Sequence, residues 1–442
     1  MSTELYRRHR RALMKQLPNG LIVLGAAPEL VRNGDVRFAY RQSSDLLYLS
    51  GVSEPGCVLV LDPARGSETL FVPRLSQAHA VWLGHIPSAG EARDRFGIRS
   101  VRYRDELAAV LKARAPRLVH ADAFAAPLVR KIRPSVRLRR PELRDALDEL
   151  RVVKDKGELA LLRRASAATA IGHLAAMRFA RAGLYEYQVQ AELERHFRHA
   201  GGTDLGYTSI VATGRNGAVL HYHANSARLR RGELLLIDAG SEYRGYTADV
   251  TRSFPVSGRF SARQRDIYSI VLETQARCID FARAGNTSMD LQRLAERRLA
   301  EGLRDLRLLH GSLDELTQTE AVRLFFPHGI GHTLGLDVHD TQGGPARRLP
   351  KTKTARIRFR ARLEPGFVIT IEPGIYFIAA LLNDRALRRK HRGRIDFTKA
   401  ERFLDFGGVR IEDDVVIRPK GPPENLTLVP KQVEAIEAAC AA

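Results

Sequence analysis

Hydrophobic residues in the first third of the chain form short runs that are bounded by turn-forming residues. Consecutive apolar residues predict buried strands, and apolar residues that recur every three or four positions predict helices. The expected strands are Leu21–Gly25, Cys57–Leu61 and Thr69–Val72, and the expected helices are Leu107–Ala113 and Ala123–Ile132. This alternation predicts a small α/β domain.

A long helical pattern begins near residue 155. Apolar residues recur at helical spacing through Asp155–Arg181, and Ala182-Gly183 closes the segment. A second helix is expected at Tyr187–His199, where three small residues follow it. We place a domain boundary near residue 152, which gives domains 1–152 and 153–442.

After residue 205 the pattern changes to strands that two helices interrupt. The expected strands are Ser209–Ala212, Leu234–Asp238, Val250–Phe254, Phe367–Glu372, Gly408–Glu412 and Val415–Ile417, and the expected helices are Ala262–Ala284 and Met289–Glu301. Helices followed by strands predict an α+β fold for this larger part of the chain.

Acidic residues close three of the apolar runs. Asp238 ends Leu-Leu-Leu-Ile-Asp, Glu372 ends Val-Ile-Thr-Ile-Glu, and Glu412 ends Val-Arg-Ile-Glu. A carboxylate beside a buried strand is costly unless it is paired or bound to a cation. Each acid alone also fits a structural role, such as capping a turn.

A fourth acid, Asp249, follows Asp238 by eleven residues. Gly240 and Gly245 lie between them and suit a hairpin turn that would place the two acids side by side. Two carboxylates held together raise each other's pKa unless a metal compensates for their charge.

Two histidines stand among glycines in His328-Gly-Ile-Gly-His332, and His339 follows seven residues later. Four carboxylates and one histidine form an oxygen-rich ligand set that suits Mn²⁺, Co²⁺ or Zn²⁺ in a two-metal catalytic site. A structural zinc site would instead use a closed shell of cysteine and histidine. The combination favours metal-dependent hydrolysis.

The motifs that carry these residues are LLLIDAGSEYRGYTADVTRSFPVSGRF, HGIGHTLGLDVHD, ITIEPGIYF and GGVRIEDDVV. They resemble the pita-bread (creatinase/aminopeptidase) metallopeptidases, in the branch of the Xaa-Pro aminopeptidases (aminopeptidase P) and the prolidases (Xaa-Pro dipeptidases). YRQSSDLLYLSGVSEPG and LFVPRLSQAHAVWLGHIP near the N-terminus are similar to the same family. The resemblance implies an α+β chain with a C-terminal pita-bread domain after a smaller α/β creatinase-like domain.

The resemblance also implies a dinuclear site that usually holds Mn²⁺, with Co²⁺ or Zn²⁺ as alternatives. Its metal ligands would be Asp238, Asp249, His332, Glu372 and Glu412. Glu372 matches the family's general base. The implied substrates are proline-containing di- or oligopeptides, and the family forms dimers or tetramers.

Further residues match catalytic or substrate-contacting positions of the family. His221 and His339 match the histidines near the scissile bond, which can polarise its carbonyl. The matches to substrate-contacting or supporting positions are His328, Tyr207 and Arg410, and Trp82 matches a residue that reaches the neighbouring subunit's site. A buried core position is the alternative for Trp82.

Two subclasses remain open, and we favour the prolidase over aminopeptidase P. The region from His221 to Phe260 is similar to the aminopeptidases, whereas the forty residues from Glu372 to Glu412 are prolidase-like. Arg358 stands where prolidases carry an arginine that faces the substrate's C-terminal carboxylate. It alternates with Arg356, Arg360 and Arg362, so a solvent-exposed basic strand is the alternative.

Composition narrows the other function classes. The 442 residues carry a formal charge of +21, yet no nucleic-acid-binding motif accompanies it, so an Arg-rich solvated surface is favoured over nucleic-acid binding. A creatinase-like hydrolase would not need the metal ligands. Three scattered cysteines and the lack of a long apolar segment predict a cytoplasmic protein without a membrane span.

Overall fold

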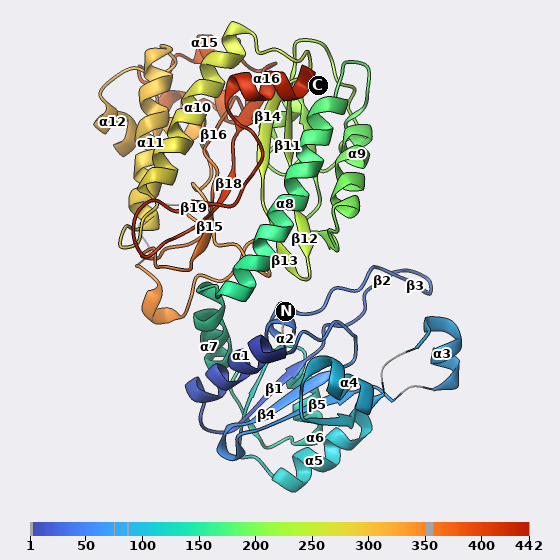
Figure 1. Ribbon diagram of the computed structural model, residues 1–442. Coiled ribbons are helices and arrows are strands. Elements are labelled where there is room, and N and C mark those ends of the chain that lie inside the picture. The colour runs from blue at the N-terminus through green and yellow to red at the C-terminus, as the bar shows by residue number, and fades with distance from the viewer. Residues whose placement is uncertain (1–2, 75, 86–87, 351–356, 442) are drawn as a thin grey trace. The chain divides into compact units, whose positions relative to one another are not determined.

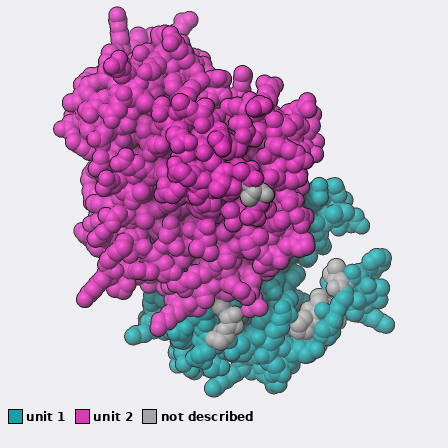
Figure 2. Space-filling view, turned by 45° about the horizontal axis from the view of Figure 1, so that its top comes forward, with its two compact units in different colours: residues 1–151, 343–346 teal, residues 152–342, 347–442 magenta. Residues whose placement is uncertain are grey.

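The computed structural model describes residues 3–74, 76–85, 88–350 and 357–441. The chain divides into two compact units (Figure 2). Unit 1 comprises Met1–Arg151 and Gly343–Ala346, and unit 2 comprises Val152–Gln342 and Arg347–Ala442. In the described ranges, no helix combines the length and apolarity that a membrane crossing needs.

Unit 1 is built on a six-stranded mixed sheet in the order β6-β5-β4-β1-β7-β8 (Figure 1). β1 is antiparallel to β4 and parallel to β7. The strands are β1 (Leu21–Gly25), β4 (Val58–Asp62), β5 (Ser67–Val72), β6 (Ser100–Tyr103), β7 (Leu118–Ala121) and β8 (Arg137–Leu138), and a separate hairpin joins β2 (Val31–Asn33) to β3 (Val36–Arg37).

The helices of unit 1 complete an α/β layer structure, as the sequence predicted. They are α1 (Thr3–Gln16), α2 (Ser44–Ser50), α3 (Gln77–Leu83), α4 (Ala89–Phe96), α5 (Leu107–Arg114), α6 (Ala126–Ile132) and α7 (Pro141–Val152). α5 and α6 share a core with alternate residues of β1 and β4. α6 starts three residues later than expected, because Asp122 accepts a hydrogen bond from the Ala125 amide and holds a turn there.

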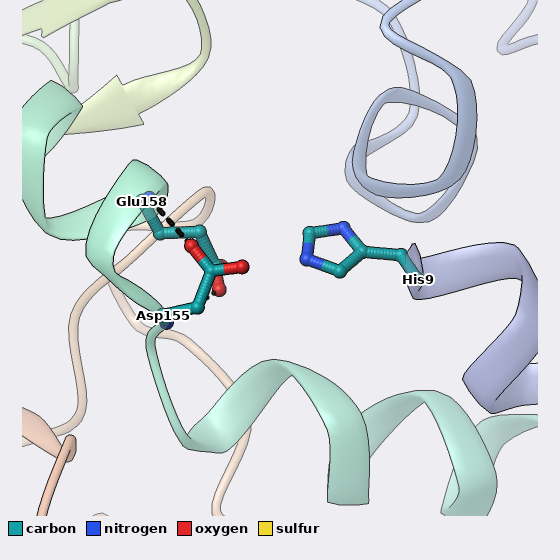
Figure 3. A group of neighbouring side chains, drawn as sticks. All are labelled: His9, Asp155 and Glu158. Carbon is teal, nitrogen blue, oxygen red and sulfur yellow. Dashed lines mark hydrogen bonds between the residues drawn. The ribbon is translucent and has the colours of Figure 1, made fainter. Parts of the chain in front are cut away.

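Four long helices of unit 2 cover its strands: α8 (Lys156–Phe179), α9 (Glu186–His199), α10 (Ala262–Phe281) and α11 (Ser288–Asp305). α8 begins at a capping box in which Asp155 accepts from the Glu158 amide and Glu158 accepts from the Asp155 amide. Figure 3 shows these two side chains at the start of the helix. The shorter helices are α12 (Leu313–Gln318), α13 (Ala379–Leu382), α14 (Arg385–Lys390), α15 (Phe397–Glu401) and α16 (Val433–Ala441).

The strands of unit 2 form small antiparallel sheets, in the orders β10-β11-β14, β13-β12-β9, β15-β18-β19 and β16-β17. Their bounds are β9 (Asp204–Leu205), β10 (Ile210–Thr213), β11 (Leu234–Asp238), β12 (Ser241–Tyr243), β13 (Tyr246–Thr247), β14 (Thr251–Pro255), β15 (Val368–Ile371), β16 (Gly374–Tyr376), β17 (Gly408–Arg410), β18 (Asp413–Val416) and β19 (Glu424–Asn425). α8 contacts β12 and β13, and α10 contacts β15, β16 and β17 (Figure 1). The α+β prediction is confirmed.

Two local expectations need correction. Gly245 lies in the turn between β12 and β13, with φ of 89°. Gly240 is not in that turn but lies between β11 and β12, where a Cβ would come within 1.8 Å of the Ala248 oxygen. The expected strand Gly408–Glu412 is also broken, because β17 pairs with β16 while Glu412 forms an isolated bridge with Thr251.

Candidate metal centre

The carboxylates and the histidine that the sequence singled out line one cavity of about 400 Å³ in unit 2. Its lining includes Asp238, Asp249, His332, Glu372 and Glu412, together with Tyr207, His221, His328, His339, Arg358 and Arg410. These residues come from segments that are up to 205 positions apart in the chain, between Tyr207 and Glu412.

Strand pairing brings the acidic residues together. Asp238 at the end of β11 pairs with Thr251 at the start of β14, and Asp249 precedes Thr251 by two residues. Thr251 also forms the bridge to Glu412. Glu372 directly follows β15, so the acids lie where strands from two sheets end.

His332 is fixed on the edge of β15. Its amide donates to Thr370 Oγ1 at 3.1 Å, and its carbonyl accepts from the Thr370 amide at 2.9 Å. Its Nδ1 lies 3.1 Å from the Thr333 carbonyl, so Nδ1 carries the proton and donates to that oxygen. The lone pair of Nε2 therefore faces into the cavity.

Three carboxylates surround that lone pair. His332 Nε2 lies 3.3 Å from Asp249 Oδ2, 3.7 Å from Glu372 Oε1 and 4.0 Å from Glu412 Oε1. Asp249, His332 and Glu412 each offer a ligand atom within 4.8 Å of the others. Lone pairs that converge in this way repel one another unless a cation lies between them, so the donor set fits a bound metal.

The hydroxyl of Tyr207 also lies between two carboxylates of this set. It lies 2.6 Å from Asp238 Oδ1 and 2.5 Å from Asp249 Oδ1, although a phenol has one proton to donate. Burial, with the neighbouring carboxylates, raises the pKa of Glu372 to about 7 and raises the pKa of Asp249 and Glu412. Divalent cations at this position would remove the cost of burying these charges together.

A directed hydrogen-bond chain leads from the acids to His328. Arg410 donates from Nη2 to Asp238 at 2.5 Å and from Nη1 to the Tyr376 hydroxyl at 2.9 Å. Nδ1 of His328 lies 2.8 Å from the Gly329 carbonyl and donates to it, so its Nε2 accepts from the Tyr376 hydroxyl at 2.9 Å. Burial, with the nearby Arg410 charge, lowers the pKa of His328 to about 3, so this ring is neutral at pH 7.

A second neutral histidine, His339, also lines the cavity. Arg358 Nη1 donates to His339 Nδ1 at 3.1 Å, which leaves the proton of His339 on Nε2. Burial, with the nearby Arg358 charge, lowers the pKa of His339 to about 3. The His339 ring packs edge-on against His332, at 4.4 Å between centroids. His339 can therefore donate an N–H to a group bound beside the acids.

Comparisons with known proteins identify the family of this chain. The model of metallopeptidase family M24 matches residues 160–419, and that of the aminopeptidase P N-terminal domain matches residues 6–119. The chain belongs to metallopeptidase family M24. A pita-bread domain that follows an aminopeptidase P-type N-terminal domain is therefore the fold, as expected.

Two named M24 relatives are about equally similar to this chain. The human Xaa-Pro dipeptidase is 36% identical, over 95% of this chain and 88% of its own length. The Xaa-Pro aminopeptidase of Escherichia coli K12 is 35% identical, over 99% and 98%. The solved Zn-substituted E. coli aminopeptidase P in complex with product has a TM-score of 0.87 and 33% identity, and the match covers 100% of this chain and 98% of that one.

Two residues that support the cavity side chains were missed in the sequence. Tyr376 joins Arg410 to His328, and Thr251 donates to Glu412 Oε2 at 2.7 Å while accepting from Arg410 Nε at 3.0 Å. Both stand inside the quoted motifs, in ITIEPGIYF and ADVTRSF. Threonine and tyrosine are also common core residues of strands, so sequence alone did not mark them.

The remaining expectations concern Trp82 and the basic segment. Trp82 lies on α3 of unit 1 and is 84% exposed, so the core alternative is wrong, and its contact with a neighbouring subunit's site stays a prediction. Arg358 lines the cavity, while Arg360 donates to Leu349 O and Arg362 to Gly285 O. Arg356 lies outside the described residues.

The glycine before His332 gives a first prediction. A Cβ on Gly331 would lie 2.0 Å from the Thr370 oxygen, in the backbone that holds His332 on β15. We expect Gly331→Ala to lower the free energy of unfolding by about 1–3 kcal/mol, as overpacking does, and to weaken Mn²⁺ binding. Urea unfolding and metal titration measure the two effects. Gly90→Ala is the control, since its Cβ would meet only Ser88 Oγ at 3.9 Å; equal stability of both variants would contradict the packing argument.

Proposed function

We propose that the chain is a two-metal peptidase that hydrolyses the bond before proline. The observation that carries the proposal is the convergence of Asp238, Asp249, His332, Glu372 and Glu412 on one cavity, a donor set that suits divalent cations. These five are the proposed metal ligands, with Mn²⁺ as the preferred ion and Co²⁺ or Zn²⁺ as alternatives. Such ions act as Lewis acids and make a bound water more acidic near neutral pH.

The chain's own residues have separate tasks in this proposal. Glu372 is the candidate general base, because its carboxylate faces the cavity beside His332. His339 donates its Nε2 proton to the scissile carbonyl, and His221 lines the same cavity. An Xaa-Pro bond has no N–H, so a site that polarises the carbonyl suits proline better than one that binds the amide.

The supporting residues orient these groups. Arg410 and Tyr207 hold Asp238, and Tyr376 holds His328 in its neutral tautomer. His328 is thereby available as a substrate contact. The proposal keeps 1–152 and 153–442 as the two domains. It also includes a homo-oligomer in which Trp82 contacts the site of a neighbouring subunit. We further propose a cytoplasmic location.

Within the M24 family we favour a prolidase, with aminopeptidase P as the alternative. The observation behind this preference is Arg358, an exposed guanidinium in the cavity wall that donates to His339. A dipeptide places its free carboxylate one residue beyond the cut, and an arginine there provides a charge-assisted pair that a longer substrate lacks.

Matched substrates and one substitution test the preference. We expect Ala-Pro to be cleaved with a higher kcat/KM than Ala-Pro-Ala in the presence of Mn²⁺. Arg358→Ala should raise KM for Ala-Pro by about 10- to 100-fold, the value of a charged hydrogen bond, with little change for the tripeptide. Arg362→Ala is the control, because Arg362 does not line the cavity. Faster cleavage of the tripeptide by the unmodified protein would assign it to the aminopeptidases instead.

A further inference from the structure

A buried carboxylate lies outside the metal cavity, at the first residue of α9. Glu186 has no exposed surface. Its Oε1 accepts from the Thr213 amide at 2.7 Å and from Asn216 Nδ2 at 3.0 Å. Its Oε2 accepts from the Tyr222 hydroxyl and the Ala227 amide, both at 2.8 Å. Four donors match the four acceptor positions of a carboxylate, so Glu186 is fully satisfied.

All four donors belong to one segment, the end of β10 and the loop that follows it to Ala227. This loop carries His221 and His223 to the cavity wall. After the short 3₁₀ turn Gly214–Ala218 it contains no regular helix or strand up to residue 226. Its conformation therefore depends on side-chain contacts rather than on a backbone ladder.

The contact through Tyr222 is the most direct. Tyr222 is the residue after His221, and its hydroxyl lies 3.1 Å from Asn216 Nδ2 as well as 2.8 Å from Glu186. Asn225 gives a second anchor, since it bonds the Val211 amide and the Ser209 carbonyl of the neighbouring strand region. The His221 side chain itself is exposed. The position of its ring therefore depends on the hydrogen bonds that Tyr222 and Asn225 make elsewhere in the loop.

We propose that Glu186 is the positioning residue for His221: it binds both ends and the middle of the loop and so holds the imidazole at the substrate. The inference rests on the proposed role of His221 in peptide hydrolysis. Hydrogen bonds to an ionised acceptor are stronger than bonds between neutral groups. The Glu186 carboxylate accepts four such bonds from the segment between Thr213 and Ala227. A small displacement of a reacting group lowers the rate steeply, so loosening this loop should affect turnover before it affects folding.

A double-substitution cycle tests the coupling. Glu186→Gln keeps the shape but turns an amide NH₂ toward two donors. It should lower kcat on Ala-Pro by about 10- to 100-fold, with KM and Mn²⁺ affinity little changed. In a His221→Ala background the same substitution should change kcat by less than about twofold, because interacting residues are not additive. An equal loss of kcat in both backgrounds would overturn the proposal.

Two further variants guard against a merely structural effect. Glu192→Gln is the matched control on the same helix, since Glu192 pairs with Arg195 and His196 of that helix, and it should leave kcat unchanged. Tyr222→Phe removes only the hydroxyl, with its hydrogen bonds to Glu186 and Asn216, and replaces Glu186→Gln in the cycle if the latter does not fold.

Hydrogen exchange of residues 214–227 gives a readout that is independent of activity. Exchange should be at least about tenfold faster in Glu186→Gln than in the unmodified protein and in Glu192→Gln, as expected for a local opening. If the unmodified protein cleaves no Xaa-Pro peptide, the proposed function fails, and this exchange alone then decides whether Glu186 holds the loop. Unchanged exchange would reject the positioning role.

Discussion

Asp249→Asn is expected to lower kcat/KM for Ala-Pro by at least about 10³-fold, because metal ions contribute several kcal/mol to such reactions. The Asp249 carboxylate is 3.3 Å from His332 Nε2 and 2.5 Å from the Tyr207 hydroxyl, at the centre of the proposed ligands. Asparagine keeps the size but removes the charge, so the centre should bind less Mn²⁺. Hydrolysis assays and the metal content per chain measure both effects.

The same substitution should have the opposite effect on the metal-free protein. Burial, with the nearby Asp238 charge, raises the pKa of Asp249, which shows that the negative charge is costly in the absence of a cation. Asp249→Asn should therefore leave the Tm of the metal-free form unchanged or higher, while the rise in Tm on adding Mn²⁺ is lost. Asp280→Asn, at an exposed ion pair with Arg283, is the control. Activity within tenfold of normal after metal removal would contradict the two-metal proposal.

Arg252→Met is expected to lower the free energy of unfolding by about 3–5 kcal/mol, the usual cost of breaking a buried ion pair. Both Arg252 and Asp413 have no exposed side-chain surface, and Arg252 Nη2 lies 2.7 Å from Asp413 Oδ1. The guanidinium also donates to four backbone carbonyls, those of Thr251, Glu412, Val429 and Pro430. Methionine fills similar space but leaves these acceptors unsatisfied.

Arg252→Met should also weaken metal binding at the proposed centre. Arg252 donates to the carbonyls of Thr251 and Glu412 and so ties β14 to the segment that carries a proposed ligand. Urea unfolding of the metal-free protein gives the stability change, and Mn²⁺ titration gives the effect on binding. Arg265→Met is the control, because its pair with Glu437 is partly exposed and should contribute less than about 1 kcal/mol. Similar losses of unfolding free energy in Arg252→Met and Arg265→Met would contradict the argument that burial makes the Arg252 pair more stabilising.

The fold was largely predictable because its strands and long helices have strong patterns. β1 matches the expected Leu21–Gly25, β11 matches Leu234–Asp238, and α8 lies within Asp155–Arg181. Short elements such as β8 and β19 were missed, since two residues in a ladder carry no periodicity of their own. The Gly408–Glu412 strand was overextended because its break depends on partners, β16 on one side and Thr251 on the other.

Sequence comparison leaves the subclass undecided for a physical reason. Both kinds of enzyme cleave the bond before proline, and the two kinds of substrate differ in how far the chain extends beyond the cut. Human dipeptidase and E. coli aminopeptidase are 36% and 35% identical to this chain, so shared ancestry does not separate them. Arg358 is the residue whose placement in the cavity bears on this difference.

By itself, the sequence determined which residue types stand at the ends of buried strands, and hence the five proposed ligands and the M24 motifs around them. Charge beside a buried strand is costly, so such positions stand out without a structure. Only the tertiary structure decided which partners fix these groups. The chain from Arg410 through Tyr376 to His328, the tautomer of His339 beside Arg358, and the hold of Glu186 on the His221 loop join distant segments. Hydrogen bonds act over about 3 Å, and no local pattern in a sequence records which distant groups come that close.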